Sequence, residues 1–181
     1  MSTSRHPYHH GDLPAALVRA AGQILDKQGL EAVTLREVAR KAGVSHGAPY
    51  RHFPSLDHLL AAVAEQGFRE LGGALKGRSA PEMGEAYVRF ALEQPQRFRL
   101  MFGGVLPLAK YPELSTVAQG AYQALVEAFK ELPRPELAAA AAWSLVHGLS
   151  HLLLDGHFAS EDRDTFVREV LAAVRFAQRA A

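Results

Sequence analysis

Apolar residues recur at spacings of three and four residues along most of the chain, and this periodicity limits the possible folds more than any other feature. The first periodic face consists of Leu13, Ala16, Leu17, Ala20, Ala21, Ile24 and Leu25. Further helical segments begin near Pro81, Pro95, Pro112 and Pro135. Spacing of this kind places apolar side chains on one face of an α-helix. No stretch alternates as a β-strand requires, so the sequence predicts an all-α protein.

Local signals bound two helices near the N-terminus. Asp12 is placed to cap the first helix and Gly29 to end it. Thr34 followed by Glu37 is a capping box, in which each side chain would satisfy a free amide at the helix start. The second helix is therefore expected from about Leu35 to Ala42.

A tight stop and a third short helix are expected to follow. Gly43 suits the left-handed conformation that ends a helix, and Val44 is expected to point inward. Ser45 is placed to cap a helix that continues through His52. Pro49 falls at the edge of its first turn, where at most one backbone hydrogen bond is lost.

The remaining signals divide the chain into three parts. A long helix begins at Leu56 and is expected to fray near Gly72, Gly73 and Gly77. Asp155-Gly156 stops a later helix, and Ser160 is placed to cap the last one, which carries Phe166, Val170, Val174 and Ala177. The predicted parts are an N-terminal helical domain at 1–55, a linking helix at 56–76 and a C-terminal helical domain at 77–181.

Two motifs resemble those of the tetracycline-repressor (TetR) family. The residues of 34–39 and 42–53 closely resemble the family's helix-turn-helix signature, and those of 8–13 resemble the start of many members. Trp143 followed by His147-Gly148 is similar to the Trp-His-Gly motif of one C-terminal domain type in the family. The resemblance implies an all-α homodimer with a three-helix DNA-binding domain, a linking fourth helix, and a C-terminal helical bundle that binds a ligand.

The resemblance also implies a function. It predicts a cytoplasmic transcriptional regulator, by family default a repressor, that binds a pseudo-palindromic double-stranded DNA operator. A small apolar or amphipathic effector would release the DNA. Pairing between subunits is assigned to the last two helices, from Pro135 to Gly156 and from Glu161 to Arg179.

The DNA-contacting residues are expected around the turn. Side chains at the start of a recognition helix reach base edges, and free amides there favour phosphate. Tyr50 and His52 are assigned to phosphates because the family's tyrosine and histidine have that role. Leu56 departs from the family, whose members usually carry lysine there. The predicted DNA-binding residues are Thr34, Leu35, Arg36, Ser45, His46, Gly47, Ala48, Pro49, Tyr50 and His52.

The ligand site is expected among aromatic residues of the C-terminal part. Each of these residues sits at helical spacing and is individually expected in a plain core, so only their number argues for a pocket. The predicted lining is Phe98, Met101, Phe102, Tyr122, Trp143 and His147. His147 or Arg99 is the candidate for orienting the ligand.

Composition excludes several classes of protein. Twenty basic and nineteen acidic residues leave a formal charge of +1, so any DNA contact must come from a local basic patch. The absence of cysteine excludes disulfides and thiolate metal sites and fits a reducing compartment. The start of the chain does not read as a secretory signal. The uncharged run from Leu137 to Leu154 is long enough to span a membrane but is weakly apolar, which favours a helix buried in protein on all sides.

Three alternatives remain open. His147, His151 and Asp155 share one helix face at a spacing that zinc sites use, although buried histidines bonded across a helix interface are the favoured interpretation, with no metal or cofactor. Arg97, Arg99, His147 and Asp155 would be the candidate site of a small helical enzyme, but no catalytic motif accompanies them. An architectural dimer with a vestigial DNA-binding part is the third alternative.

Overall fold

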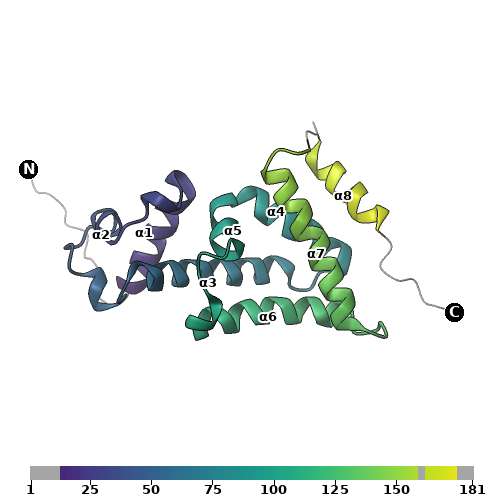
Figure 1. Cartoon of the computed structure of the whole chain (residues 1–181), viewed down its shortest axis with the longest axis horizontal. Helices are drawn as coiled ribbons and strands as arrows, with labels where there is room; N and C mark the ends of the chain where they lie inside the picture. The colour runs from purple at the N-terminus through teal and green to yellow at the C-terminus, as the bar shows by residue number, and fades with distance from the viewer. Residues whose placement is uncertain (1–12, 159–161, 175–181) are drawn as a thin grey trace, which may run out of the picture. The chain divides into compact units, whose positions relative to one another are not determined.

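The computed structural model of the chain describes residues 13–158 and 162–174, which contain eight α-helices, three short 3₁₀ helices and no β-strand (Figure 1). The predicted all-α fold is therefore confirmed. The α-helices are α1 Leu13–Gln28, α2 Leu35–Ala42, α3 Leu56–Leu75, α4 Ala80–Glu93, α5 Pro95–Phe102, α6 Pro112–Ala128, α7 Pro135–Leu154 and α8 Arg163–Ala173. The 3₁₀ helices are η1 Leu30–Ala32, η2 Pro49–Arg51 and η3 Leu108–Lys110.

The chain divides into two compact units, with the division between Val63 and Ala64 inside α3. We call the described residues up to 63 the head and those from 64 onward the body. In the head, α1 packs against α2 and η1, and α2 packs against η2. The fully buried side chains of this small core include Leu17, Ala21, Leu25, Val33, Val38, Leu59 and Val63.

In the head, the helices predicted from local sequence signals agree with the structure as far as Gly43. The α1 and α2 helices have the expected ends, and Gly29 and Gly43 adopt positive φ angles of 84° and 71°. Gly43 donates its amide to the carbonyl oxygens of Ala39 and Arg40, which closes the end of α2 in the left-handed geometry. The predicted cap residue Asp12 lies outside the described residues.

The predicted third helix from Ser45 to His52 is wrong in extent. Only Pro49–Arg51 is helical, as the 3₁₀ helix η2, and it is preceded by a turn in which the Ala48 amide bonds the Ser45 carbonyl at 2.9 Å. Pro49 has no N–H to donate to that same carbonyl, so the first α-helical hydrogen bond after a cap at Ser45 is missing. The first residue of the predicted helix therefore lies in a turn.

The body is built around α4, which packs against α5, α6, α7 and α8. Figure 1 shows α7 crossing α4, with α8 beside them. Gly84 permits a close approach of α8, because a Cβ atom there would lie 3.1 Å from Leu171 Cδ1. The buried side chains of α4 and α7 in this core include Met83, Tyr87, Val88, Ala91, Val146, Leu149 and Leu153.

The proline-led starts in the body are confirmed. Pro95, Pro112 and Pro135 are the first residues of their helices, where the missing N–H removes no intrahelical bond. Pro81 is the second residue of α4. The expected fraying near Gly72 and Gly73 is wrong, since α3 continues to Leu75 before Gly77 turns with φ 73°.

The end of the chain is only partly described. Ser160 and Ala177 lie outside the described residues, and α8 begins after Asp162. The Asp162 carboxylate accepts the Thr165 amide at 2.9 Å and therefore caps the helix.

The expectation that α7 is buried on all sides is wrong for the single chain. Among the described helices, α7 alone is long and apolar enough to cross a membrane, and 33% of that stretch is buried. Leu137 and Leu152 are 59% and 41% exposed, and Ala141 is also exposed. One stripe of the helix therefore has no covering element within the described part of the chain.

Candidate functional site

The first candidate site is the exposed turn of the head. The Thr34 hydroxyl accepts the Glu37 amide at 3.1 Å and caps α2. The Glu37 carboxylate instead accepts Arg40 Nε at 2.8 Å, so only the Thr34 half of the predicted capping box is present. The cap holds the start of α2 in one conformation in front of the turn.

The residues predicted to contact DNA divide by burial. Leu35, Ala48 and Pro49 are buried, so their side chains anchor α2 and η2 within the head. Tyr50 is 62% exposed although tyrosine is usually at least half-buried. The other exposed members of the predicted set are Thr34, Arg36, Ser45, His46, Gly47 and His52.

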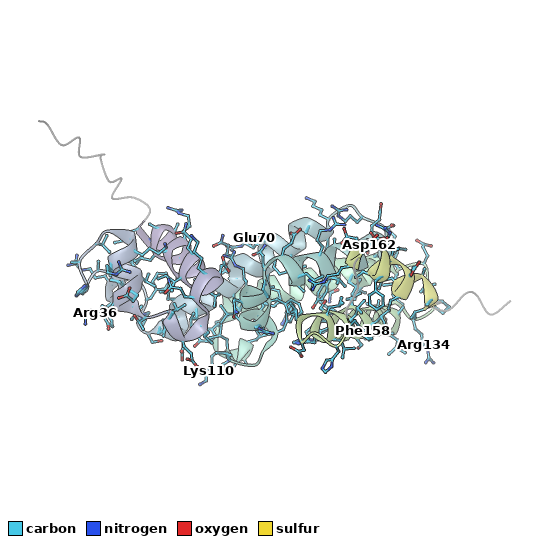
Figure 2. All side chains as sticks on the ribbon, turned by 90° about the horizontal axis from the view of Figure 1, so that it is seen from above. Arg36, Glu70, Lys110, Arg134, Phe158 and Asp162 are labelled. Carbon is cyan, nitrogen blue, oxygen red and sulfur yellow. The ribbon has the colours of Figure 1, made fainter. Side chains whose placement is uncertain are left out.

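Three exposed cationic side chains that sequence reasoning did not single out flank this surface. Arg40 and Lys41 lie on the last turn of α2, and Arg51 lies in η2. Together with Arg36, whose position at the surface Figure 2 shows, they are opposed within residues 34–53 only by Glu37. The count of lysine and arginine near the turn could have identified this local basic surface in a chain of formal charge +1.

Leu56, at the start of α3, occupies the position where the family usually carries lysine. Leu56 is half-buried, and the preceding Ser55 hydroxyl lies 2.8 Å from His58 Nδ1 and 3.4 Å from the His58 amide. Ser55 is therefore engaged as the local cap of α3, which leaves the backbone amides of the first turn at the surface.

The second candidate site is a cavity of about 760 Å³ inside the body. Its walls come from α3, α4, α5, η3, α6, α7 and α8, and most of its lining is apolar. Of the six residues predicted to line a ligand site, Met101, Phe102, Tyr122 and Trp143 are in its wall. The other two, Phe98 and His147, are not among the lining residues.

Phe98 and His147 lie directly behind the wall. Phe98 is fully buried, and its ring centroid is 5.8 Å from that of Tyr87 and 4.9 Å from that of Phe102. The His147 ring is 5.5 Å from Phe98 and 4.7 Å from His151. These rings support the wall in edge and tilted contacts that aromatic groups favour.

Tyr87 is a buried polar residue of the cavity wall that sequence reasoning missed. It lines the cavity, it is 5% exposed, and its hydroxyl joins two other polar groups. Trp143 Nε1 donates to the Tyr87 hydroxyl at 3.1 Å, and the same hydroxyl lies 2.9 Å from His147 Nδ1. Nothing in the sequence distinguishes Tyr87 from the other core positions of α4, because its partners are 56 and 60 residues away.

Burial sets the charge of this trio. It raises the pKa of the Tyr87 phenol well above its ordinary value, against a smaller opposing effect of the bond from Trp143. Burial also lowers the pKa of the His147 imidazole, and the neighbouring His151 lowers it further. At neutral pH, both groups are therefore uncharged, which suits an apolar cavity wall.

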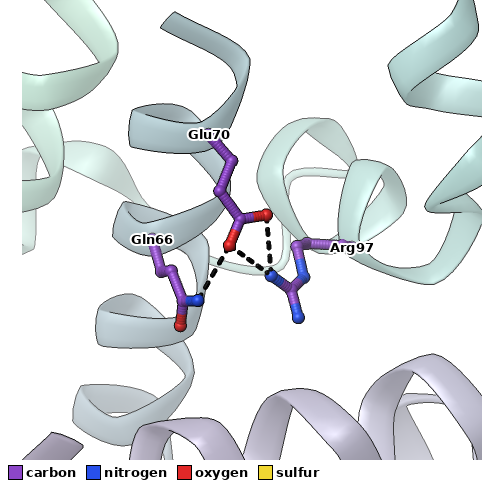
Figure 3. A network of polar contacts seen from close by, with 3 residues as sticks. All are labelled: Gln66, Glu70 and Arg97. Carbon is purple, nitrogen blue, oxygen red and sulfur yellow. Dashed lines mark hydrogen bonds and ion pairs between the residues drawn. The ribbon is translucent and has the colours of Figure 1, made fainter. Parts of the chain in front are cut away.

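A polar contact joins α5 to α3 behind the cavity (Figure 3). Arg97 Nη1 donates to both carboxylate oxygens of Glu70, at 3.0 and 3.1 Å, and Gln66 donates to the same carboxylate at 2.8 Å. Gly67 lies beneath this contact, where a Cβ atom would be 2.6 Å from Met101 Sδ. The cavity residues of α5 are therefore held tightly against α3.

His147, His151 and Asp155, which share one face of α7 and its end, do not form a metal-binding cluster. Asp155 lies 3.4 Å from Arg99 in an exposed ion pair, and no cluster of three histidine or carboxylate side chains suited to a metal occurs in residues 13–158 and 162–174. His147 is bonded to Tyr87, and Arg97 to Glu70. The residues of the imagined enzyme site thus belong to three separate contacts.

Two family models match the chain. Residues 17–63 match the model described as bacterial regulatory proteins of the tetR family. Residues 81–174 match the tetracyclin repressor-like C-terminal domain. The two matches cover the head with its turn and most of the body with its cavity.

Individual curated relatives match over about a third of this chain. The transcriptional repressor Rv3405c of Mycobacterium tuberculosis is 32% identical over 59 residues, which are 33% of this chain and 31% of that protein. The repressor KstR of Mycolicibacterium smegmatis is 41% identical over 66 residues, 36% and 32% of the two chains. The chain thus spans about a third of the length of these curated relatives.

Solved structures match over nearly the whole chain. A protein of unknown function from Rhodococcus sp. RHA1 is 31% identical, with a TM-score of 0.78 over 93% of this chain and 94% of that one. The multidrug binding protein EbrR in complex with ethidium is 19% identical, with a TM-score of 0.65 over 88% and 96%. At that identity, the second likeness concerns the fold alone. The matched families and named relatives are regulators and not enzymes.

Proposed function

The chain belongs to the TetR family of bacterial transcriptional regulators, and we propose that it represses transcription by binding a pseudo-palindromic operator through the turn of its head. One observation carries the proposal: Tyr50, Ser45 and His46 are exposed beside a surface with four lysines and arginines. These exposed polar and aromatic side chains have no role in the head's own core, which favours a role in binding.

The cations and the turn have different parts in binding. Arg36, Arg40, Lys41 and Arg51 neutralise phosphates, which gives affinity without reading sequence. Ser45, His46 and Gly47 precede η2 and supply the contacts to base edges and to the backbone. Tyr50 donates to a phosphate, while buried Ala48 and Pro49 hold the turn in place.

Selection of bound DNA from random oligonucleotides tests this function. We expect a two-fold symmetric site whose half-sites lie about 34 Å apart, or a multiple of that distance. His46→Ala and Tyr50→Ala should weaken binding to the selected site while leaving the circular dichroism spectrum and melting temperature unchanged. Equal binding of selected DNA and random competitor by the wild-type protein at moderate salt would refute the proposal.

Two lysine variants, one in the head and one in the body, distinguish a contact with a DNA phosphate from a general effect of charge. Lys41→Ala should lower the slope of log affinity against log salt by about one, since one released counterion is lost. Lys110→Ala removes an equally exposed lysine from the body and should leave that slope unchanged. Identical slopes for the two variants would remove Lys41 from the DNA contact.

The proposed dimer uses the uncovered stripe of α7 together with α8. Leu137, Ala141, Gly148 and Leu152 follow one another at four- or seven-residue spacing and lie on one helix face. Small residues between the two exposed leucines allow the same helix of a second copy to approach closely, and burial removes the apolar stripe from water.

Sedimentation at micromolar concentration tests the dimer. The wild-type protein should sediment as a dimer, and Ala141→Arg should sediment as a monomer because a charge enters the packed face. Gln123→Arg places the same side chain on exposed α6 and should leave the dimer intact. A monomeric wild-type protein would contradict the interface and the two-fold operator together.

The proposed effector is an apolar or amphipathic small molecule that occupies the cavity. A volume of about 760 Å³ with apolar walls matches the sites that bury most of a drug-sized ligand. The effector releases DNA if it binds better to the conformation that fits the operator poorly. A tenfold loss of DNA affinity requires about 1.4 kcal/mol of such preference.

Trp143 reports on this binding directly, since it is the only tryptophan, lines the cavity and is 38% exposed. Hydrophobic metabolites that change its fluorescence should also dissociate the selected DNA. Release of DNA by stoichiometric zinc or nickel, abolished in His151→Ala, would instead support a metal-responsive regulator.

A further inference from the structure

Tyr87 holds an unusual place in the cavity wall because it is a buried polar residue whose hydroxyl contacts two other polar groups. Six polar side chains line the cavity: Glu85, Tyr87, Gln119, Tyr122, Trp143 and Arg168. Of these, Tyr87 alone is buried. The Tyr122 hydroxyl donates to the Glu136 carbonyl at 3.3 Å, and the Trp143 N–H is used by Tyr87.

The chemistry of Tyr87, Trp143 and His147 allows two arrangements of their hydrogens, which differ in the tautomer of His147. An indole N–H only donates, so the Tyr87 oxygen accepts from Trp143. In the first arrangement, the Tyr87 proton points to the unprotonated Nδ1 of neutral His147, 2.9 Å away, which places the histidine proton on Nε2. In this arrangement, the Tyr87 proton is directed behind the wall and the cavity surface remains apolar.

A second arrangement keeps both contacts of the Tyr87 oxygen but leaves the Tyr87 proton without an acceptor among the three groups. If His147 carries its proton on Nδ1, it donates to the Tyr87 oxygen, which can accept from both His147 and Trp143. The Tyr87 proton is then free to donate into the cavity. The net number of protons in the site does not change, because His147 loses a proton from Nε2 and gains one on Nδ1.

We propose that Tyr87 is the hydrogen-bond donor of the effector site, and that it selects apolar ligands that carry one uncharged acceptor, such as the carbonyl of an aromatic ketone or ester. The proposal rests on the proposed role of the cavity as the effector site. A ligand carbonyl takes the Tyr87 proton, and His147 supplies the compensating bond from behind. The site therefore recognises a single oxygen without exposing a free donor when empty.

The arrangement predicts a pH dependence. The titratable groups that face His147 are Tyr87 from α4 and His151 on its own helix, whereas α5 presents the uncharged rings of Phe98 and Phe102. The Arg99–Asp155 ion pair follows one turn beyond His151. Doubly protonated His147 must donate from Nδ1, so acid favours the arrangement that binds a carbonyl.

Two neutral dyes of similar size test the proposal in the full-length protein. Prodan is an aromatic ketone, and N-phenyl-1-naphthylamine has no carbonyl. Tyr87→Phe should weaken prodan binding about three- to tenfold, the value of one hydrogen bond, and should change binding of the naphthylamine less than twofold. The emission of bound prodan should shift to the blue in this variant, since its carbonyl loses the donor.

Two further variants separate a ligand contact from a structural role. Tyr122→Phe removes the other cavity hydroxyl and should leave the ratio of the two affinities unchanged. His147→Phe removes the competing acceptor, so prodan should bind at least as tightly as in the wild type and without the increase in affinity that the wild type shows as the pH falls below 6.5.

The outcomes distinguish this inference from the function on which it rests. Equal loss of both dyes in Tyr87→Phe would show a structural role and overturn the donor assignment while the cavity remains a ligand site. Unchanged prodan binding in that variant would also overturn the assignment. Failure of both dyes to bind the wild-type protein would overturn the cavity as an effector site and the donor assignment with it.

Discussion

The head and the body of this chain arrange their candidate sites in opposite ways. In the head, the exposed residues between Thr34 and His52 lie on consecutive elements above a closed core, in which Leu17, Leu25, Val33 and Val38 are at most 1% exposed. In the body, helices from α3 to α8 enclose a cavity of about 760 Å³. The candidate site of the head is therefore an exposed surface, and that of the body is an internal cavity.

This difference follows from what each partner requires. DNA is a large, charged object that is read from outside, so side chains must project from a rigid support. A small apolar molecule is bound by removing its surface from water, so the walls must come from several directions and leave space. Core packing is therefore complete in the head, whose candidate site lies at the surface, and incomplete in the body, whose candidate site lies inside.

The largest expected effect compares leucine truncation in the two regions. Leu25→Ala removes a fully buried side chain of the head and should lower the free energy of unfolding by about 2–5 kcal/mol. Leu125→Ala removes a half-buried side chain from the cavity wall and should cost less than about 2 kcal/mol, because part of its surface already faces empty space. Urea titrations followed by circular dichroism measure both values. Equal costs would show that the body is packed as completely as the head.

A smaller effect compares a glycine of each region. Gly43→Ala forces a left-handed residue onto the end of α2, at φ 71°, and should cost about 1–2 kcal/mol. Gly120→Ala places a Cβ on helical α6, where no atom lies within 4 Å, and should stabilise by up to about 1 kcal/mol. Thermal unfolding of the two variants should therefore shift in opposite directions. Shifts of the same sign would contradict the assigned backbone requirement.

The smallest effect compares the helix caps of the two regions under acid. The Glu82 carboxylate accepts the Ser79 hydroxyl at 2.6 Å and the Ser79 amide at 2.8 Å, and these bonds lower the pKa of Glu82 from 4.5. A lowered folded-state pKa stabilises the fold above pH 4.5, and this contribution is lost as the pH falls through the folded value. Ser79→Ala should therefore flatten the fall of Tm between pH 5 and pH 3.

The controls for this prediction lie in both regions. Ser144→Ala removes a hydroxyl that bonds only the Ala140 carbonyl, and it should leave the acid limb unchanged. Thr34→Ala removes the cap of the head, whose oxygen accepts a backbone amide, and should cost about 1 kcal/mol at every pH. If Tm falls as steeply between pH 5 and pH 3 in Ser79→Ala as in the wild type, Glu82 does not contribute to the loss of stability in acid.

The sequence located the candidate site of the head more completely than that of the body. The turn motif identified the surface of the head, and the structure added only the cations at positions 40, 41 and 51 and the burial of Leu35, Ala48 and Pro49. The aromatic richness of the body indicated a pocket, but it did not distinguish Phe98, which is buried behind the wall, from Trp143, which lines the cavity. It also did not indicate Tyr87.

The sequence by itself determined what depends on neighbouring residues. The bounds of α1 and α2, the left-handed Gly43 and the proline-led starts of α5, α6 and α7 follow from caps, backbone freedom and missing amides that act within one turn. Where one local signal opposed another, at Ser45 and Pro49, the predicted extent of the helix was wrong.

Only the tertiary structure decided what depends on residues far apart in the chain. The Tyr87 hydroxyl meets Trp143 and His147 across 56 and 60 residues, and a capping pattern or helical period contains no information about that meeting. Burial then sets the charge of the phenol and the imidazole, because the cost of an ion depends on every helix that excludes water from it. The exposed stripe of α7 is likewise a result of packing, since the sequence shows an apolar helix and only the arrangement of its neighbours leaves Leu137 and Leu152 uncovered.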